Sequence, residues 1–127
     1  MKRAKGTVGI VGLGIMGGAF ASNLAASGWR VLGHDIDPKR RRALARAGVE
    51  IAADAKDLAA KAPTIITSLP APDALAVTVD AIVGAELRPR VIIETSTFTL
   101  DDKLKAEHAL SRAGHVMLDC PVSGTGS

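Results

Sequence analysis

Hydrophobic and polar positions alternate along this chain between two spacings. Short runs rich in Val, Ile and Leu predict strands buried in a sheet, and longer stretches with apolar residues three or four positions apart predict helices. Strands are expected over residues 7–11, 30–34, 49–51, 64–69, 91–94 and 115–118. Helices are expected over residues 15–27, 38–48, 72–83 and 100–112, together with one that Asp54 caps and that ends near Lys61.

This alternation of strand and helix predicts how the elements assemble. Parallel strands joined by helices need right-handed crossovers, which place helices on both faces of one sheet. The expected fold is α/β, a doubly wound and mostly parallel sheet, with residues 1–127 forming one domain. Ligands of such sheets bind beyond the carboxyl ends of the strands, so the residues that follow each strand are the candidates for a site.

The first strand end carries a glycine-rich motif. After Val8 the chain runs into Gly12-Leu13-Gly14-Ile15-Met16-Gly17, with the spacing Gly-x-Gly-x-x-Gly at the start of a predicted helix. In a dinucleotide site the first glycine allows the turn, the second lets the backbone approach a pyrophosphate, and the third lets the helix pack closely on the sheet. The N–H groups at the helix start attract phosphates. Asp35 follows the next strand, where an acidic side chain accepts hydrogen bonds from ribose hydroxyls.

The same region permits a different interpretation. Residues 6–29 carry no charge and follow a basic start, which is the pattern of a signal peptide or a membrane helix. Several glycines and the polar residues Ser22, Asn23 and Ser27 interrupt this run, which lowers its helix propensity and makes insertion into a bilayer costly. The order of strand, glycine turn, helix and second strand favours the nucleotide site, and no membrane partner is expected.

Bulk composition narrows the remaining classes. Hydrophobic residues make up 47% of the chain but aromatic residues only 2%, so the core must consist mainly of Ala, Val, Ile and Leu. The single cysteine, Cys120, excludes an internal disulfide and is typical of the reducing cytoplasm, where the protein is expected. Much of the net charge of +3 lies in the basic run 39–42 and Arg46, on one predicted helix. Without aromatic neighbours this run is expected to form a solvated face, so no nucleic-acid partner is predicted.

Three further segments follow predicted strands. They are Ser68-Leu69-Pro70, Thr95-Ser96-Thr97 and Asp119-Cys120-Pro121-Val122-Ser123-Gly124. Together with the glycine motif they resemble the signatures of the β-hydroxyacid dehydrogenases, which include 3-hydroxyisobutyrate dehydrogenase and tartronate semialdehyde reductase and are related to the NAD-binding domain of 6-phosphogluconate dehydrogenase. The resemblance spans residues 8–127. It implies a Rossmann-like fold in an oxidoreductase that transfers hydride between a nicotinamide cofactor and a small 3-hydroxyacid, of the 3-hydroxyisobutyrate or 2-hydroxy-3-oxopropionate class.

The resemblance also implies roles for individual residues. Cofactor binding is implied for Gly12, Leu13, Gly14, Ile15, Met16, Gly17, Asp35, Ser68, Leu69, Pro70 and Thr97. Binding of the substrate carboxylate or hydroxyl is implied for Ser123, Gly124 and Thr125. A hydroxyl beside backbone freed by glycine makes a small concavity suited to an anion. Cys120 and Thr125 stand where the family usually has alanine and a second glycine, so the identity of the acid stays open.

The choice between NAD and NADP depends on Asp35. A carboxylate at this position can hold both ribose hydroxyls of NAD, and it repels the 2′-phosphate of NADP. Related NADP enzymes tend to carry Asn-Arg where this chain has Asp35-Ile36. The basic run 39–41 could instead reach a 2′-phosphate, which keeps NADP as the alternative. NAD is the predicted cofactor.

One part of the family's machinery has no counterpart in these 127 residues. Family members use a lysine as general acid/base, in a Gly-x-x-x-Lys setting that lies beyond the substrate signature and leads to an all-helical C-terminal domain. Lys103 and Lys105 precede the signature and do not match this lysine, so the resemblance assigns no catalytic residue here. The helical domain, which would also make a homo-oligomer, is absent from the sequence.

Three hypotheses follow from these residues and motifs. The chain is the cofactor domain of a β-hydroxyacid dehydrogenase, or a stand-alone dinucleotide-binding module without catalysis, or part of another reductase such as an imine reductase or a 6-phosphogluconate dehydrogenase relative. The histidines and Cys120 show no metal-ligand spacing, so no metal is expected in any of the three.

Overall fold

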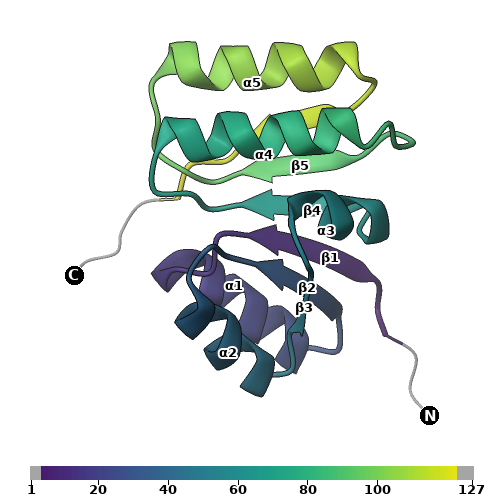
Figure 1. The fold of residues 1–127 in the computed structure, drawn as a ribbon, viewed down its shortest axis with the longest axis vertical. Helices are drawn as coiled ribbons and strands as arrows, with labels where there is room; N and C mark the ends of the chain where they lie inside the picture. Colours follow the sequence, from purple (N-terminus) through teal and green to yellow (C-terminus); the bar gives the residue numbers. More distant parts are fainter. Residues whose placement is uncertain (1–3, 123–127) are drawn as a thin grey trace.

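The computed structural model describes residues 4–122 and places them in one sheet with helices on both faces (Figure 1). The strands are β1 (Thr7–Val11), β2 (Arg30–His34), β3 (Glu50–Ile51), β4 (Thr64–Thr67), β5 (Val91–Glu94) and β6 (Val116–Asp119). The helices are α1 (Ile15–Ala26), α2 (Pro38–Arg46), α3 (Ala55–Lys61), α4 (Pro72–Gly84) and α5 (Leu100–Arg112). The strand order is β3-β2-β1-β4-β5-β6, and all neighbouring strands are parallel. The predicted α/β, doubly wound, Rossmann-like fold is confirmed.

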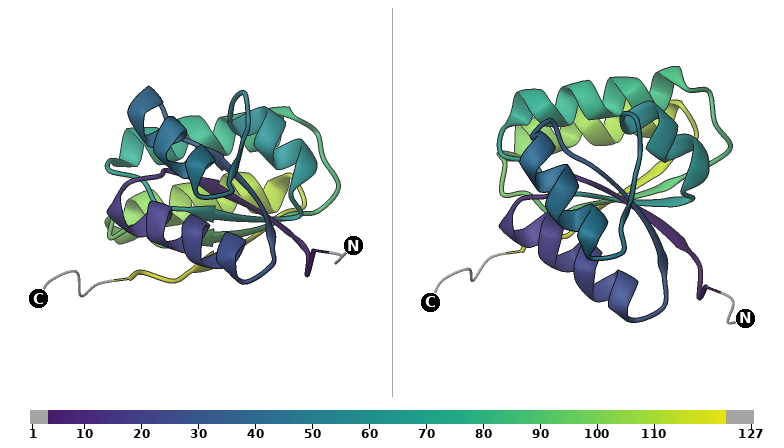
Figure 2. Two further views of the ribbon diagram at one scale, coloured as in Figure 1. Left: turned by 90° about the horizontal axis from the view of Figure 1, so that it is seen from below. Right: turned by 60° about the horizontal axis from the view of Figure 1, so that its bottom comes forward.

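Two apolar clusters lie on the two faces of the sheet. Helices α3, α4 and α5 cover one face, where Leu58, Leu75 and Leu110 belong to the same cluster as Ile65 and Ile92 of the sheet. Helices α1 and α2 cover the other face (Figure 2). The buried residues there are Val8, Ile10, Leu13, Ala21, Val31 and Val49. Both clusters are aliphatic, as the composition requires. Within residues 4–122, no helix has both the length and the apolar character needed to cross a membrane.

Two predicted elements end two residues earlier than their patterns indicate, and the other predicted bounds agree with the structure to within one residue. The strand expected over 64–69 ends at Thr67, because the N–H of Leu69 donates to the Ser96 hydroxyl at 3.0 Å instead of continuing the ladder. The helix expected over 38–48 ends at Arg46, because Gly48 adopts a φ of 92° and terminates it. The chain therefore leaves β4 through a turn, and this turn forms part of the site described below.

His115, just before β6, gives the fold a pH dependence. The side chain is buried, and its Nδ1 accepts a hydrogen bond from the N–H of Arg90 at 2.9 Å. Burial lowers the pKa of His115 below its usual 6.5, and the positive charge of Arg90 adds to this. At a pH between the lowered pKa and 6.5, the unfolded chain therefore binds a proton at His115 that the folded chain does not bind. Stability is expected to fall as the pH drops below 6.5, with a limiting slope of about 1.4 kcal/mol per pH unit.

Urea unfolding between pH 7.5 and 5.5 measures this dependence. His115→Asn keeps an acceptor near the N–H of Arg90 and removes the titration, so its unfolding midpoint should vary less with pH. His108→Asn is the control, because the side chain of His108 is 66% exposed in α5. Equal pH slopes for the native protein and His115→Asn would contradict the prediction.

Candidate functional site

The turn between β1 and α1 depends on two glycines. Gly12 has a φ of 98°, in the left-handed region that costs other residues about 1–2 kcal/mol, and a Cβ there would overlap the carbonyl oxygen of Ser68. A Cβ at Gly17 would overlap the carbonyl oxygen of Gly12. The backbone of the turn therefore packs directly against α1 and against the end of β4, as the glycine spacing predicts.

The N-terminus of α1 lacks the side-chain cap that three other helices have. Asp37, Asp54 and Thr99 accept hydrogen bonds from first-turn N–H groups of α2, α3 and α5 at 2.8, 2.7 and 3.3 Å. In α1 the cap residue is Gly14, which has no side chain, and the first turn contains no acidic residue. The first-turn N–H groups of α1 are therefore available to an external acceptor such as a phosphate oxygen.

A pocket of about 1030 Å³ opens beside this helix end, with residues from the carboxyl ends of β1, β2 and β4 in its lining. Its size is at the upper end of the roughly 300–1,000 Å³ found for ligand pockets. Apolar side chains are exposed in its wall: Ile15 is 90% exposed and Ile36 is 89% exposed. Backbone N–H groups, a carboxylate, a guanidinium and apolar side chains thus face one space of cofactor size.

Asp35 lines this pocket but is only 7% exposed. Its Oδ2 accepts a hydrogen bond from the N–H of Leu13 at 2.7 Å, and its Oδ1 accepts one from the N–H of Asp37 at 2.8 Å. The carboxylate therefore ties the glycine turn to the segment after β2, which the sequence did not indicate. An ionised carboxylate has about four acceptor positions, and these two bonds use two of them.

Two arginines of α2 turn toward the same residue. The guanidinium of Arg41 donates to the carbonyl oxygen of Asp35 at 2.7 Å, and Nη1 of Arg40 lies 3.6 Å from Asp35 Oδ2. Nη1 of Arg40 is also 3.6 Å from the place that a Cβ on Gly14 would occupy. The prediction of a solvated basic face is therefore incomplete, because the carboxylate and carbonyl after β2 attract these two side chains. Arg40 places a positive charge beside the glycine turn.

A fully buried carboxylate organises the ends of β4 and β5. Glu94 Oε2 accepts a hydrogen bond from the Thr67 hydroxyl at 3.0 Å, and Oε1 accepts one from the N–H of Ser96 at 2.6 Å. The hydroxyl of Ser96 accepts the N–H of Leu69 at 3.0 Å. Glu94 thus fixes Ser96, and Ser96 fixes the turn 68–70 that forms one wall of the pocket.

The end of β6 is held from two sides. The N–H of Cys120 donates to the carbonyl oxygen of Glu94 at 2.8 Å, which extends the pairing with β5. On the other side, Nζ of Lys103 in α5 lies 2.6 Å from Asp119 Oδ1. The spacing of these residues in the sequence gives no sign of this ion pair, because α5 has to pack on β6 before the two charges meet.

Most of the residues predicted to bind a cofactor come together. Gly12, Gly14, Ile15, Met16, Asp35, Ser68, Leu69 and Pro70 all line the pocket. Leu13 and Gly17 lie behind its wall, since the Leu13 side chain is buried in the cluster under α1 and Gly17 packs on the turn. Thr97 is exposed after β5 and is not among the described residues that line the pocket. The predicted substrate residues Ser123, Gly124 and Thr125 lie outside the described residues.

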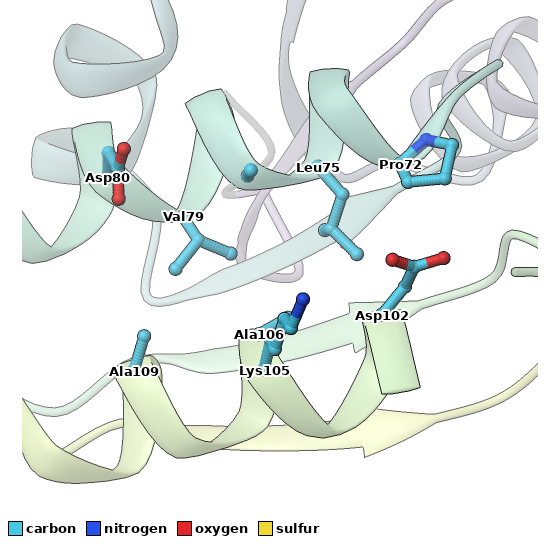
Figure 3. A pocket seen from close by; sticks show the side chains of 9 residues that line it. Pro72, Leu75, Val79, Asp80, Asp102, Lys105, Ala106 and Ala109 are labelled. Carbon is cyan, nitrogen blue, oxygen red and sulfur yellow. The ribbon is translucent and has the colours of Figure 1, made fainter. Parts of the chain in front are cut away.

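A smaller hollow of about 200 Å³ lies between α4 and α5 (Figure 3). Leu75 and Val79 of α4 face Ala106 and Ala109 of α5 across it. The glycine turn and Asp35 contribute nothing to its lining, which is mainly aliphatic. Three charged residues, Asp80, Asp102 and Lys105, also line it, but the glycine turn and Asp35 belong to the larger pocket alone.

Residues 7–127 match the family described as the NAD binding domain of 6-phosphogluconate dehydrogenase. The chain belongs to this family. This NAD-binding domain is 32% identical over 119 residues to a probable 3-hydroxyisobutyrate dehydrogenase of Mycobacterium tuberculosis, covering 93% of the chain and 40% of the relative. It is 32% identical over 124 residues to the mitochondrial 3-hydroxyisobutyrate dehydrogenase of Rattus norvegicus, covering 95% of the chain and 37% of the relative.

Solved structures show the same architecture. The M. tuberculosis 3-hydroxyisobutyrate dehydrogenase determined with L-serine superposes on the NAD-binding domain with a TM-score of 0.89 at 29% identity, covering 94% of this chain and 41% of that one. An imine reductase of Streptomyces aurantiacus superposes with a TM-score of 0.80 at 25% identity, covering 87% and 39%. The chain therefore spans about 40% of the length of the proteins it matches.

Proposed function

We propose that this domain binds NAD and forms the cofactor-binding part of a dehydrogenase that acts on a small 3-hydroxyacid, of the 3-hydroxyisobutyrate or 2-hydroxy-3-oxopropionate class. The observation that carries the proposal is the uncapped N-terminus of α1, which opens through Gly14 into the pocket beside Asp35. Unpaired N–H groups suit a pyrophosphate, and the carboxylate suits ribose hydroxyls. The names of relatives at 32% identity support the reaction class.

The residues of this chain would bind and orient the reactants. The nicotinamide, when bound, supplies the hydride acceptor or donor, and the protein fixes its position relative to the substrate. The turn 68–70 and Thr97 would lie along the cofactor. Ser123, Gly124 and Thr125 would hold the carboxylate of the acid. No residue of the chain is proposed as the general acid/base.

Asp35 favours NAD over NADP in this proposal. A 2′-phosphate placed at the ribose would meet the carboxylate at short range, and even in water two unit charges ~4 Å apart repel by about 1 kcal/mol. Arg40, 3.6 Å from this carboxylate, offsets part of the repulsion. NADP is therefore expected to bind more weakly than NAD rather than to be excluded.

Location and assembly complete the proposal. The relatives include a bacterial enzyme from Pseudomonas aeruginosa and several proteins named as mitochondrial. Cys120 is a free, exposed thiol, which suits a reducing compartment, and we assign the domain to the cytoplasm. A homo-oligomer is proposed only for a protein that also carries the C-terminal helical domain implied by the resemblance.

Imine reduction is the second candidate reaction. It is supported by the imine reductase of S. aurantiacus, whose structure matches this domain with a TM-score of 0.80. The two reactions differ in the hydride acceptor and share the cofactor site. They can therefore be distinguished only with a protein that also carries the C-terminal helical domain implied by the resemblance. Reduction of a cyclic imine without oxidation of 3-hydroxyisobutyrate would favour this candidate.

Titration of the protein with NADH and NADPH, followed by nicotinamide fluorescence, tests the cofactor site. Saturable binding of NADH is expected, about fivefold tighter than that of NADPH. Gly14→Ala should weaken NADH binding tenfold or more, because a methyl group there stands where the pyrophosphate approaches. It should cost the fold no more than about 1 kcal/mol, since its Cβ meets nothing closer than Arg40 Nη1 at 3.6 Å.

Gly84→Ala is the matched control for this titration. Gly84 ends α4, and a Cβ there meets nothing within 4 Å, so the dissociation constant for NADH should not change. Absence of saturable NADH binding, or equal affinity of Gly14→Ala, would refute the proposed site. Tighter binding of NADPH would overturn only the choice of NAD.

A further inference from the structure

Lys103 is a lysine in an unusual place for its charge. It lies in the first half of α5 and is only 5% exposed, whereas Lys105, two residues later, is exposed. Removing an ammonium group from water is costly unless a partner compensates its charge. The partner is Asp119, whose Oδ1 lies 2.6 Å from Nζ of Lys103. The ion pair therefore compensates the burial of the ammonium group, and it links α5 to the end of β6.

The segment that leaves β6 is bound at successive positions. Asp119 is tied to α5 by the ion pair, and the N–H of Cys120 donates to the carbonyl oxygen of Glu94 at 2.8 Å. The N–H of Val122 donates to the carbonyl oxygen of Thr95 at 3.1 Å. The backbone bonds fix this segment against β5, and the ion pair fixes it against the helix layer. Without the ion pair, this segment would keep its backbone bonds to Glu94 and Thr95 and lose its link to α5.

We propose that Lys103 is a positioning residue, which fixes the chain from Asp119 to Val122, directly ahead of the residues proposed to bind the substrate carboxylate. The proposal rests on the function proposed above for Ser123, Gly124 and Thr125. Lys103 itself does not touch the substrate, because its ammonium is buried and bound to Asp119. It acts through the position of Asp119 and of the backbone that follows.

Lys103→Met removes the charge and keeps a long, flexible side chain of similar reach. Hydrogen exchange of the Cys120 and Val122 amides is expected to accelerate tenfold or more, while exchange of the β1 and β2 amides stays unchanged. The NADH dissociation constant should stay the same, because the cofactor pocket is lined by other residues.

Two variants make the result specific. Lys103→Arg keeps the positive charge and should restore slow exchange, and Lys105→Met, on the exposed face of the same helix, should behave like the native protein. Unchanged exchange of the Cys120 and Val122 amides in Lys103→Met would overturn the proposal. Uniform acceleration over the whole sheet would also overturn it, since Lys103 would then only stabilise the fold. If Lys103→Met does not fold, Asp119→Asn gives the same readouts, because Asp119 is at the surface.

A binding measurement separates this proposal from the proposed function. With NADH present, the affinity for 3-hydroxyisobutyrate is expected to be at least threefold lower in Lys103→Met than in the native protein, and to be restored in Lys103→Arg. Failure of the native protein to bind the acid would count against the proposed substrate, while the exchange rates of the Cys120 and Val122 amides would still decide the role of Lys103.

Discussion

Gly17→Ala is expected to lower the free energy of unfolding by about 3 kcal/mol or more. The added methyl group would overlap the carbonyl oxygen of Gly12, which is backbone and cannot rotate away as a side chain can. Relief requires α1 to move off the sheet, and this uncovers part of the cluster around Ile10 and Ala21. Urea unfolding followed by the fluorescence of Trp29, the single tryptophan, measures the change. NADH binding should be lost together with stability.

Comparison with two other glycines shows whether the loss has this cause. Gly84→Ala adds the same methyl group where nothing lies within 4 Å, and it should leave stability unchanged or raise it slightly. Gly14→Ala should weaken cofactor binding while the protein stays folded. A Gly17→Ala protein as stable as the native one would mean that α1 does not pack on the turn as described.

Glu94→Ala is expected to cost about 3 kcal/mol of stability and to loosen one wall of the pocket. Glu94 is fully buried, and its removal leaves the Thr67 hydroxyl and the N–H of Ser96 without an acceptor inside the protein. It also leaves a cavity of nearly one side chain between β4 and β5. Urea unfolding measures the stability, and exchange of the Leu69 amide reports on the wall of the pocket.

Two further glutamate variants test the cause of this loss. Glu94→Gln fills the same volume but has one acceptor oxygen in place of two, so it should cost less than Glu94→Ala and still be measurable. Glu107→Ala removes a partly exposed carboxylate from α5 and should change stability by no more than about 0.5 kcal/mol. Similar costs for all three variants would contradict a specific role of the buried carboxylate.

The order of strands and helices could be predicted from the sequence because its signals are local. The run around Ile10 is apolar and ends at a glycine, which marks a strand followed by a turn. Asp37 is a capping residue, and Pro38, directly after it, is the first residue of α2. Asp54 likewise caps α3, as predicted. Each of these signals lies within a few residues of the element it defines, so no knowledge of the packing is needed.

The connections that shape the site are not local, and the sequence did not reveal them. The bond from the N–H of Leu13 to Asp35 spans 22 residues, and the ion pair of Lys103 with Asp119 spans 16. Many carboxylates and cations in the chain could make such pairs, and only the packed sheet selects among them. Glu94 and Asp119 end neighbouring strands, yet Glu94 binds the Thr67 hydroxyl and the N–H of Ser96, whereas Asp119 pairs with Lys103.

The strand order has a consequence for how the domain comes apart. The chain up to β3 builds one side of the sheet and the chain from β4 onward builds the other, so the pairing of β1 with β4 is the seam between two contiguous halves. The pocket lies over this seam, with Gly14 and Asp35 from the first half and Leu69 and Pro70 from the second. A ligand bound there contacts both halves and stabilises their pairing. At a free concentration of a hundred times its dissociation constant, it raises the free energy of unfolding by about 2.7 kcal/mol. The cofactor would thus serve the integrity of the domain as well as its chemistry.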